Sequence, residues 1–123
     1  MVENKKSRSY RDLEVWKLAI SFVKDIYQAT ERFPANENYG LTQQIRRAAV
    51  SIPSNIAEGQ VRNSSREFNH FLAIALGSAA ELETQLIIAK EINYLTIEGL
   101  KLLLNNLEII MKMIKRLSIT IKG

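Results

Sequence analysis

The chain has 123 residues, of which 46% are hydrophobic, and a formal net charge of +4. This length and apolar content suffice for one domain with its own core, and the absence of cysteine excludes disulfides and thiolate metal sites and fits a reducing compartment. The N-terminal sequence MVENKKSRSY lacks the apolar stretch of a signal peptide, and no apolar run approaches the ~18 residues of a membrane span. We therefore expect a cytoplasmic protein without membrane contact.

A first helix is predicted from about Asp12 to Phe33, because apolar side chains recur there at the helical period. Asp12 suits the positive start of this helix, and Pro34 stops it. Residues 1–10 are expected to form a flexible basic segment, and residues 11–121 a helical domain. The predicted core face of the first helix consists of Val15, Trp16, Ala19, Ile20, Val23, Ile26, Tyr27 and Thr30.

A second helix begins near Leu41 and contains the stretch QIRRAAVSIPSNIAEG, with Pro53 inside it and Gly59 closing it. Proline lacks the N–H that would bond the carbonyl four residues earlier, and its ring crowds that carbonyl, so we expect the helix to kink at Pro53. A neighbouring serine could satisfy the freed backbone groups. The bend either keeps Ile52 and Ile56 in the core or forms a hinge or a binding notch.

A third helix begins after Ser64, which has capping-box spacing to Glu67, and a fourth begins after Thr96 and reaches about Ile121. Four helices joined by short loops predict an all-α fold, an up-down-up-down antiparallel four-helix bundle. The third helix has a core face of three- and four-residue steps, made of Phe68, Phe71, Leu72, Ala75, Ala79, Leu82 and Leu86.

The third and fourth helices have more apolar surface than one bundle can bury. Behind its core face the third helix has small or apolar residues. Gly77 among them costs up to ~1 kcal/mol relative to alanine, and close approach of another helix is a sensible reason for a glycine there. Such faces usually mark an interface, the alternative being scattered surface hydrophobes. We expect a homo-oligomeric ring, with candidate interface residues Ala73, Gly77, Ala80, Thr84, Ile88, Leu102, Ile109 and Met113.

Basic residues gather near both ends of the sequence. Residues 1–11 hold four basic residues and one acid, and residues 112–123 hold four and no acid, so the rest of the chain sums to −3. An up-down bundle would bring both regions and the turn between the second and third helices to one end. Such an end attracts phosphate backbones, although basic residues at a helix C-terminus can serve only the dipole and solubility. The candidate nucleic-acid-binding residues here are Arg11, Arg62, Arg66, Lys115 and Arg116.

Arg46 and Arg47 lie away from that end, about one turn into the second helix, and are further candidates for nucleic-acid binding. One interpretation is an ion pair, within or between subunits, with Glu81 or Glu83 of the third helix or Asp25 of the first. The other interpretation is a contact with an RNA phosphate or a partner protein.

No catalytic or metal-binding constellation is complete in the sequence. Glu67 and His70 have the i, i+3 spacing of carboxylate-bridged di-iron bundles, but such sites need two copies, and the single histidine of the chain is predicted to point outward. A nucleophile–base pair and a glycine-rich phosphate loop are also missing. We expect a protein that is not an enzyme and that binds no metal and no cofactor.

Four stretches of the sequence resemble one family. DLEVWKLA (12–19), YGLTQQIRRAAVSIPSNIAEG (39–59), SSREFNHFLAIALGSAAELETQL (64–86) and INYL (92–95) are similar to the four-helix bundle proteins encoded in intervening sequences of bacterial 23S rRNA genes, over roughly residues 10–118. That family is in turn similar to the accessory variability determinant of diversity-generating retroelements, a basic pentameric bundle that binds a reverse transcriptase and nucleic acid.

The resemblance implies a pentameric ring that binds structured RNA, with a reverse transcriptase or another RNA-associated protein as a candidate partner. It also implies that the paired arginines Arg46 and Arg47 and the basic residues Arg62 and Arg66 belong to the binding surface. Two classes of function therefore stand side by side. The protein is either a nucleic-acid-binding accessory or an oligomeric scaffold whose charge serves only solubility.

Overall fold

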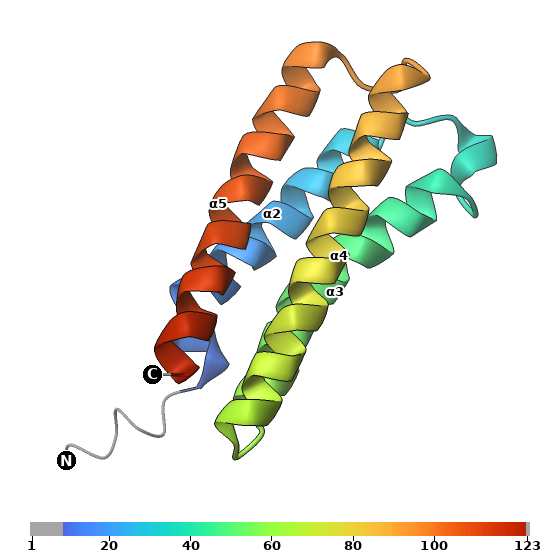
Figure 1. Cartoon of the computed structure of the whole chain (residues 1–123). Helices are drawn as coiled ribbons and strands as arrows, with labels where there is room; N and C mark the ends of the chain where they lie inside the picture. Colours follow the sequence, from blue (N-terminus) through green and yellow to red (C-terminus); the bar gives the residue numbers. More distant parts are fainter. Residues whose placement is uncertain (1–8, 123) are drawn as a thin grey trace.

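The computed structural model describes residues 9–122, which form four long helices and no strand (Figure 1). Consecutive helices run in opposite directions, so that the start of the first, the end of the last and the turn between the middle two lie at one end. The predicted all-α fold with four helices is confirmed. Its elements are η1 (Tyr10–Asp12), α2 (Glu14–Thr30), η2 (Ala35–Glu37), α3 (Leu41–Gln60), α4 (Ser65–Glu91) and α5 (Ile97–Lys122).

The predicted starts of the last two helices are confirmed by their caps. The hydroxyls of Ser64 and Thr96 each accept a hydrogen bond from the backbone N–H three residues later, at 3.2 and 2.9 Å, and so satisfy free donors of α4 and α5. The first helix is shorter than the predicted 12–33. An extended residue, Leu13, separates η1 from α2, which ends at Thr30.

The buried face of α2 is rotated relative to the predicted one. Phe22, outside the predicted face, is 2% exposed, whereas Ile20 and Tyr27 within it are 44% and 42% exposed. The reason is that α2 packs against α3 on one side and α5 on the other, so its core face is centred between these two neighbours. In α4, Phe68 and Phe71 of the predicted face are half-buried, and the remaining members are buried.

The four helices follow one another around the core, and α3 and α4 make the most extensive contact. Gly59 explains part of this closeness, because a Cβ at this position would lie 2.7 Å from the Cβ of Phe71. About two turns before Gly59 along α3, the hydroxyls of Ser51 and Ser78 are hydrogen-bonded at 2.8 Å. We call these four residues the α3–α4 seam. Gly59 lies one residue before the end of α3, close to where the sequence placed that end, and it also lets α4 approach.

Pro53 is buried inside α3, which is helical from Leu41 to Gln60. The side-chain amide of Asn55 donates hydrogen bonds to the carbonyl and the hydroxyl of Ser51, at 2.8 and 2.9 Å. The carbonyl that Pro53 leaves without a donor belongs to Ala49, so these local hydrogen bonds to Ser51 do not replace the missing one.

By length and composition α4 could cross a membrane, and it is the one helix of the described chain that could. Only 33% of its most apolar 18-residue window is buried within the bundle. The core helix of a bundle meets the same test, so this is weak evidence for a membrane. It does show that α4 has apolar surface on more than its core side.

Candidate nucleic-acid interface

Arg46 is bound to the C-terminal turn of α2. Its Nε donates to the hydroxyl of Thr30 at 2.9 Å, its Nη2 donates to the carbonyl oxygen of Tyr27 at 3.2 Å, and its guanidinium lies 4.3 Å from the centroid of the Tyr27 ring. A cation at a helix C-terminus meets free carbonyls and the negative end of the dipole. Arg46 therefore joins α3 to the end of α2.

Arg47 behaves differently from its neighbour. Its side chain is exposed and makes no hydrogen bond, ion pair or ring contact with any residue that the structure describes. Neither Arg46 nor Arg47 pairs with Glu81, Glu83 or Asp25 in the described chain, so the intramolecular ion pair expected from the sequence is not formed. An intersubunit pair or a ligand contact stays open for Arg47.

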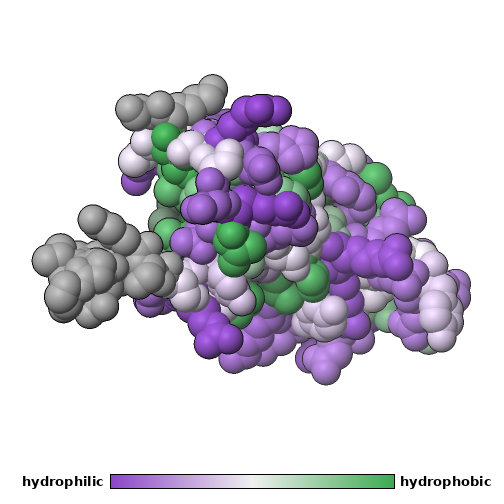
Figure 2. All heavy atoms as spheres, turned by 90° about the horizontal axis from the view of Figure 1, so that it is seen from below, coloured by the Kyte–Doolittle hydropathy of each residue, from purple (hydrophilic) through white to green (hydrophobic). Residues whose placement is uncertain are grey.

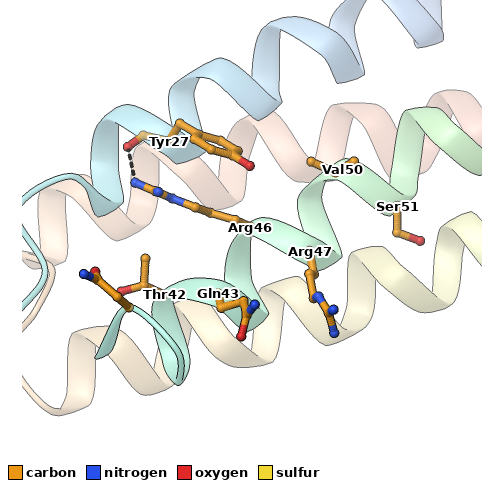
Figure 3. A pocket seen from close by; sticks show the side chains of 8 residues that line it. Tyr27, Thr42, Gln43, Arg46, Arg47, Val50 and Ser51 are labelled. Carbon is orange, nitrogen blue, oxygen red and sulfur yellow. Dashed lines mark hydrogen bonds between the residues drawn. The ribbon is translucent and has the colours of Figure 1, made fainter. Parts of the chain in front are cut away.

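An open hollow of about 650 Å³ runs along α3 and is bordered by Tyr27 of α2. In Figure 3 Arg46 points toward Tyr27, whereas Arg47 points to the other side of α3. Thr42 also lines it; this residue is 4% exposed, and its hydroxyl has no hydrogen-bond partner among the described residues. A second hollow of about 270 Å³ continues along the same two helices, lined by Trp16, Ile20 and Pro53 among others. Val50 borders both hollows. We call the pair the α2–α3 groove, which is polar at one end and apolar at the other.

The turn between α3 and α4 is less strongly basic than the sequence suggested. Arg62 forms ion pairs with Glu58 at 3.0 Å and Glu67 at 3.6 Å, and its guanidinium lies 4.9 Å from the centroid of the Phe71 ring. Its charge is thus largely compensated within the turn. Arg66 is exposed and has no ion pair within the described chain.

Four cations remain unpaired at the end of the bundle that holds the α3–α4 turn. Arg11, Arg66, Lys115 and Arg116 are exposed and form no ion pair with described residues, whereas Lys112 pairs with Glu108 at 3.5 Å. A hydrogen bond from the Ser118 hydroxyl to the Asn69 side chain joins the last turns of α5 to the first turns of α4. Figure 2 shows this end as largely hydrophilic, with small apolar spots. We call the four unpaired cations the basic end.

Seven of the eight predicted interface residues are exposed. Ala73, Gly77, Ala80, Thr84 and Ile88 all lie on the outer side of α4, and a Cβ added at Gly77 would meet no atom of the described residues within 4 Å. Leu102 and Ile109 on α5 are 63% and 52% exposed. Met113 differs, because it is half-buried and packs against the core.

His70, the only histidine, is exposed and packs edge-on against Phe71, with ring centroids 5.4 Å apart. Glu67, three residues earlier, forms an ion pair with Arg62. Among the residues that the structure describes, no group of three or more His, Cys, Asp or Glu side chains is placed to hold a metal ion.

The opposite end of the bundle holds a contact that the sequence reasoning missed. The Tyr94 hydroxyl donates to one carboxylate oxygen of Glu37 at 2.9 Å, and the other oxygen accepts from the Leu41 N–H at 3.1 Å, at the start of α3. The Glu37 carboxylate raises the pKa of Tyr94 above 10.0, mainly through this hydrogen bond. Phe33 packs on the same tyrosine, with ring centroids 5.2 Å apart. Only the tertiary fold brings these turns together, so no local signal could have found the contact.

The model of the 23S rRNA-intervening sequence protein family matches residues 11–116, which is most of the chain. No curated protein matches the sequence. The matched range includes most of η1, all of α2, α3 and α4, and most of α5, and therefore the seam, the basic end and nearly all of the groove.

Proposed function

Because the chain belongs to the family of 23S rRNA-intervening sequence proteins, we propose that it is a non-catalytic, self-associating accessory that binds RNA through the basic end of the bundle. The observation that carries this proposal is the set of unpaired cations there. Arg66, Lys115 and Arg116 come from two neighbouring helices, and Arg11 comes from η1. Uncompensated charges on adjacent elements attract a phosphate backbone through counterion release, without reading its sequence.

Self-association is supported by the apolar surface that one chain leaves uncovered. The outer side of α4 is small and apolar, and Leu102 and Ile109 of α5 are more than half exposed. A homo-oligomeric ring would bury such surfaces and repeat the basic end around its axis. We take the ring as pentameric by resemblance to the accessory variability determinant, and a reverse transcriptase or another RNA-associated protein as its candidate partner.

RNA binding is tested by two double variants that change the net charge equally. Lys115→Glu with Arg116→Glu reverses two charges of the basic end, whereas Lys24→Glu with Lys101→Glu reverses two lysines elsewhere. We expect the first pair to weaken binding of a structured RNA and to lower the slope of log affinity against log salt by about 1 for each phosphate that the protein no longer neutralises. The second pair should change both quantities little.

The alternative function is an oligomeric scaffold without a nucleic-acid role. It predicts no RNA binding at physiological salt and no difference between the two double variants. Other cations of the described chain are also unpaired, among them Lys24, Arg32 and Lys101, so the lack of ion pairs does not by itself separate the two functions. The RNA-binding function is favoured because four unpaired cations from η1, α4 and α5 are grouped at one end.

We further propose that Pro53 bends α3. The missing N–H removes one helical hydrogen bond, and the buried ring packs where α3 faces α2. Pro53→Ala would let the helix straighten, and we expect a lower melting temperature despite the better helix propensity of alanine. A melting temperature equal to or above that of the wild type would show that packing does not need the bend.

A further inference from the structure

Two surfaces of the bundle are complementary in shape and charge: one is a groove with an unpaired arginine, and the other is a ridge with an unpaired acid. The first is the α2–α3 groove, a concave surface with cationic Arg47 near one end and Trp16, Ile20 and Pro53 at the other. Exposed Ile20 and Val50 keep apolar area in contact with water along it. The Thr42 hydroxyl at its polar end has no partner among the described residues. A complementary occupant would be convex, mainly apolar and would include one acid.

The second surface is the outer side of α4. Its residues Ala73, Gly77, Ala80, Thr84 and Ile88 form a narrow convex stripe, and open space surrounds Gly77. Glu81 lies beside this stripe and is exposed; its contact within the chain is a hydrogen bond from the Gln85 side chain at 3.2 Å, and no cation of the described chain pairs with it. We call this surface the α4 ridge.

We propose that the α4 ridge of one protomer docks into the α2–α3 groove of the next, with Glu81 paired to Arg47. The proposal rests on the self-association proposed above and names the surfaces that form it. It joins a ridge with one unpaired acid to a groove with one unpaired arginine, so charge and shape agree. It also explains why position 77 is a glycine. The missing side chain lets a helix of the neighbouring protomer approach closely, whereas no described residue of the same chain lies within 4 Å of a Cβ there.

The two neighbouring arginines then have separate roles. Arg46 uses two donors to bind the end of α2 and fixes one wall of the groove. Arg47 keeps all its donors for the neighbouring protomer. A buried pair of this kind mainly sets register and partner choice, and the apolar contacts around it supply most of the attraction.

The joint is head-to-tail, because the ridge belongs to α4 and the groove to α2 and α3. A head-to-tail contact cannot close on itself as a two-fold dimer, and repetition produces a ring if the rotation closes and a filament if it does not. Both surfaces run along the sides of the bundle, so an axis roughly parallel to the helices would place every basic end on the same side of the ring. The joint therefore leaves the proposed RNA surface uncovered.

The test reverses the charge on each side of the joint. Arg47→Glu alters the groove and leaves the ridge intact, and Glu81→Arg does the opposite. Each variant alone places like charges together, and we expect about tenfold or greater weakening of assembly, seen as loss of the oligomer in size-exclusion chromatography with light scattering. A mixture of the two variants with different affinity tags brings opposite charges together wherever the two chains alternate, and we expect the tagged chains to co-purify. A ring with an odd number of subunits cannot alternate throughout, so co-purification is the readout and ring size is not.

Two matched controls separate the joint from a general charge effect. Glu83→Arg lies two residues further along α4 but lines the hollow between α4 and α5, and Lys101→Glu lies on α5. Both should assemble as the wild type does. Circular dichroism and melting temperature establish that every variant is folded, which is expected because the altered side chains are exposed.

The outcomes distinguish this joint from the wider proposed function. A monomeric wild type would remove the self-association and the joint with it. An oligomeric wild type that neither variant disturbs would overturn the joint alone, as would disruption by Glu81→Arg without disruption by Arg47→Glu, since that pattern indicates a two-fold contact between α4 helices. Failure of the mixed variants to associate would overturn the Arg47–Glu81 pairing. Absence of RNA binding by a protein that still assembles would count against the proposed role of the basic end alone and would leave the joint unaffected.

Discussion

Gly59 and Gly77 both lie inside helices, yet their surroundings are opposite. A Cβ at Gly59 would lie 2.7 Å from the Phe71 Cβ and 3.0 Å from the Phe68 ring, whereas a Cβ at Gly77 would meet nothing within 4 Å. Neither glycine has a positive φ, so backbone conformation does not require either of them. The close packing of α4 thus explains why position 59 is a glycine. No described residue accounts for Gly77, and the joint proposed above is the explanation that we offer for it.

The largest effect on stability is expected from filling the α3–α4 seam at Gly59. Gly59→Val would place three carbons against Phe71 and Phe68, and the helices would have to separate. Overpacking of this kind costs about 1–3 kcal/mol, and the better helix propensity of the new residue offsets only a fraction of it. We expect a lower midpoint of denaturant unfolding for Gly59→Val. An unchanged midpoint would mean that the seam tolerates a wider helix separation.

A second comparison, between Arg46 and Arg47, predicts an effect of intermediate size. Arg46→Ala removes two hydrogen bonds and a cation–π contact at the end of α2, and the partly exposed site suggests a loss of about 1–2 kcal/mol. Arg47→Ala should change the stability of the single chain by less than about 0.5 kcal/mol. Thermal unfolding at low protein concentration measures both. Equal losses would show that Arg47 has a partner within the chain.

Local signals in the sequence predicted the helices well, and tertiary contacts account for what they missed. Ser64 and Thr96 were found because a cap and its donor are three residues apart. The role of Arg46 was not found, because its partners lie 16 and 19 residues away on another helix. Arg62 was assigned to a basic surface from its charge, its place in the turn and the family resemblance, although acids in and beside that turn compensate it.

A similar limit applies to the apolar faces. Counting residues at the helical period correctly identified the exposed outer side of α4, because small residues there stand where a solvated helix would have Lys and Glu. The same counting placed Ile20 and Tyr27 in the core and omitted Phe22. Period alone gives the width of an apolar face, and only the positions of the two neighbouring helices decide where its centre lies.

Gly77→Ala should change stability less than Gly59→Val does, and in the opposite direction. Because the position is open within the chain, alanine should stabilise the helix by up to about 1 kcal/mol at protein concentrations where the chain is monomeric. If another helix packs against Gly77, the added methyl group should also weaken assembly. Melting temperature measured over a range of protein concentrations separates the two effects, since only assembly makes it concentration-dependent. A loss of stability at the lowest concentration would contradict the open surroundings of Gly77.

The smallest effect is expected where the α2–α3 and α4–α5 turns meet, at the end opposite the basic end. Tyr94→Phe removes the hydrogen bond to Glu37 but keeps the packing on Phe33, so stability should fall only slightly at neutral pH. The pKa of Tyr94 is raised in the folded chain, so its contribution is complete below pH 10 and is lost as the pH rises through the higher folded pKa. The stability difference between wild type and Tyr94→Phe should therefore shrink above pH 10. Tyr39→Phe, at a position 91% exposed, is the matched control and should show no such trend. A difference that stays constant across this range would mean that the tyrosine–carboxylate hydrogen bond does not stabilise the fold.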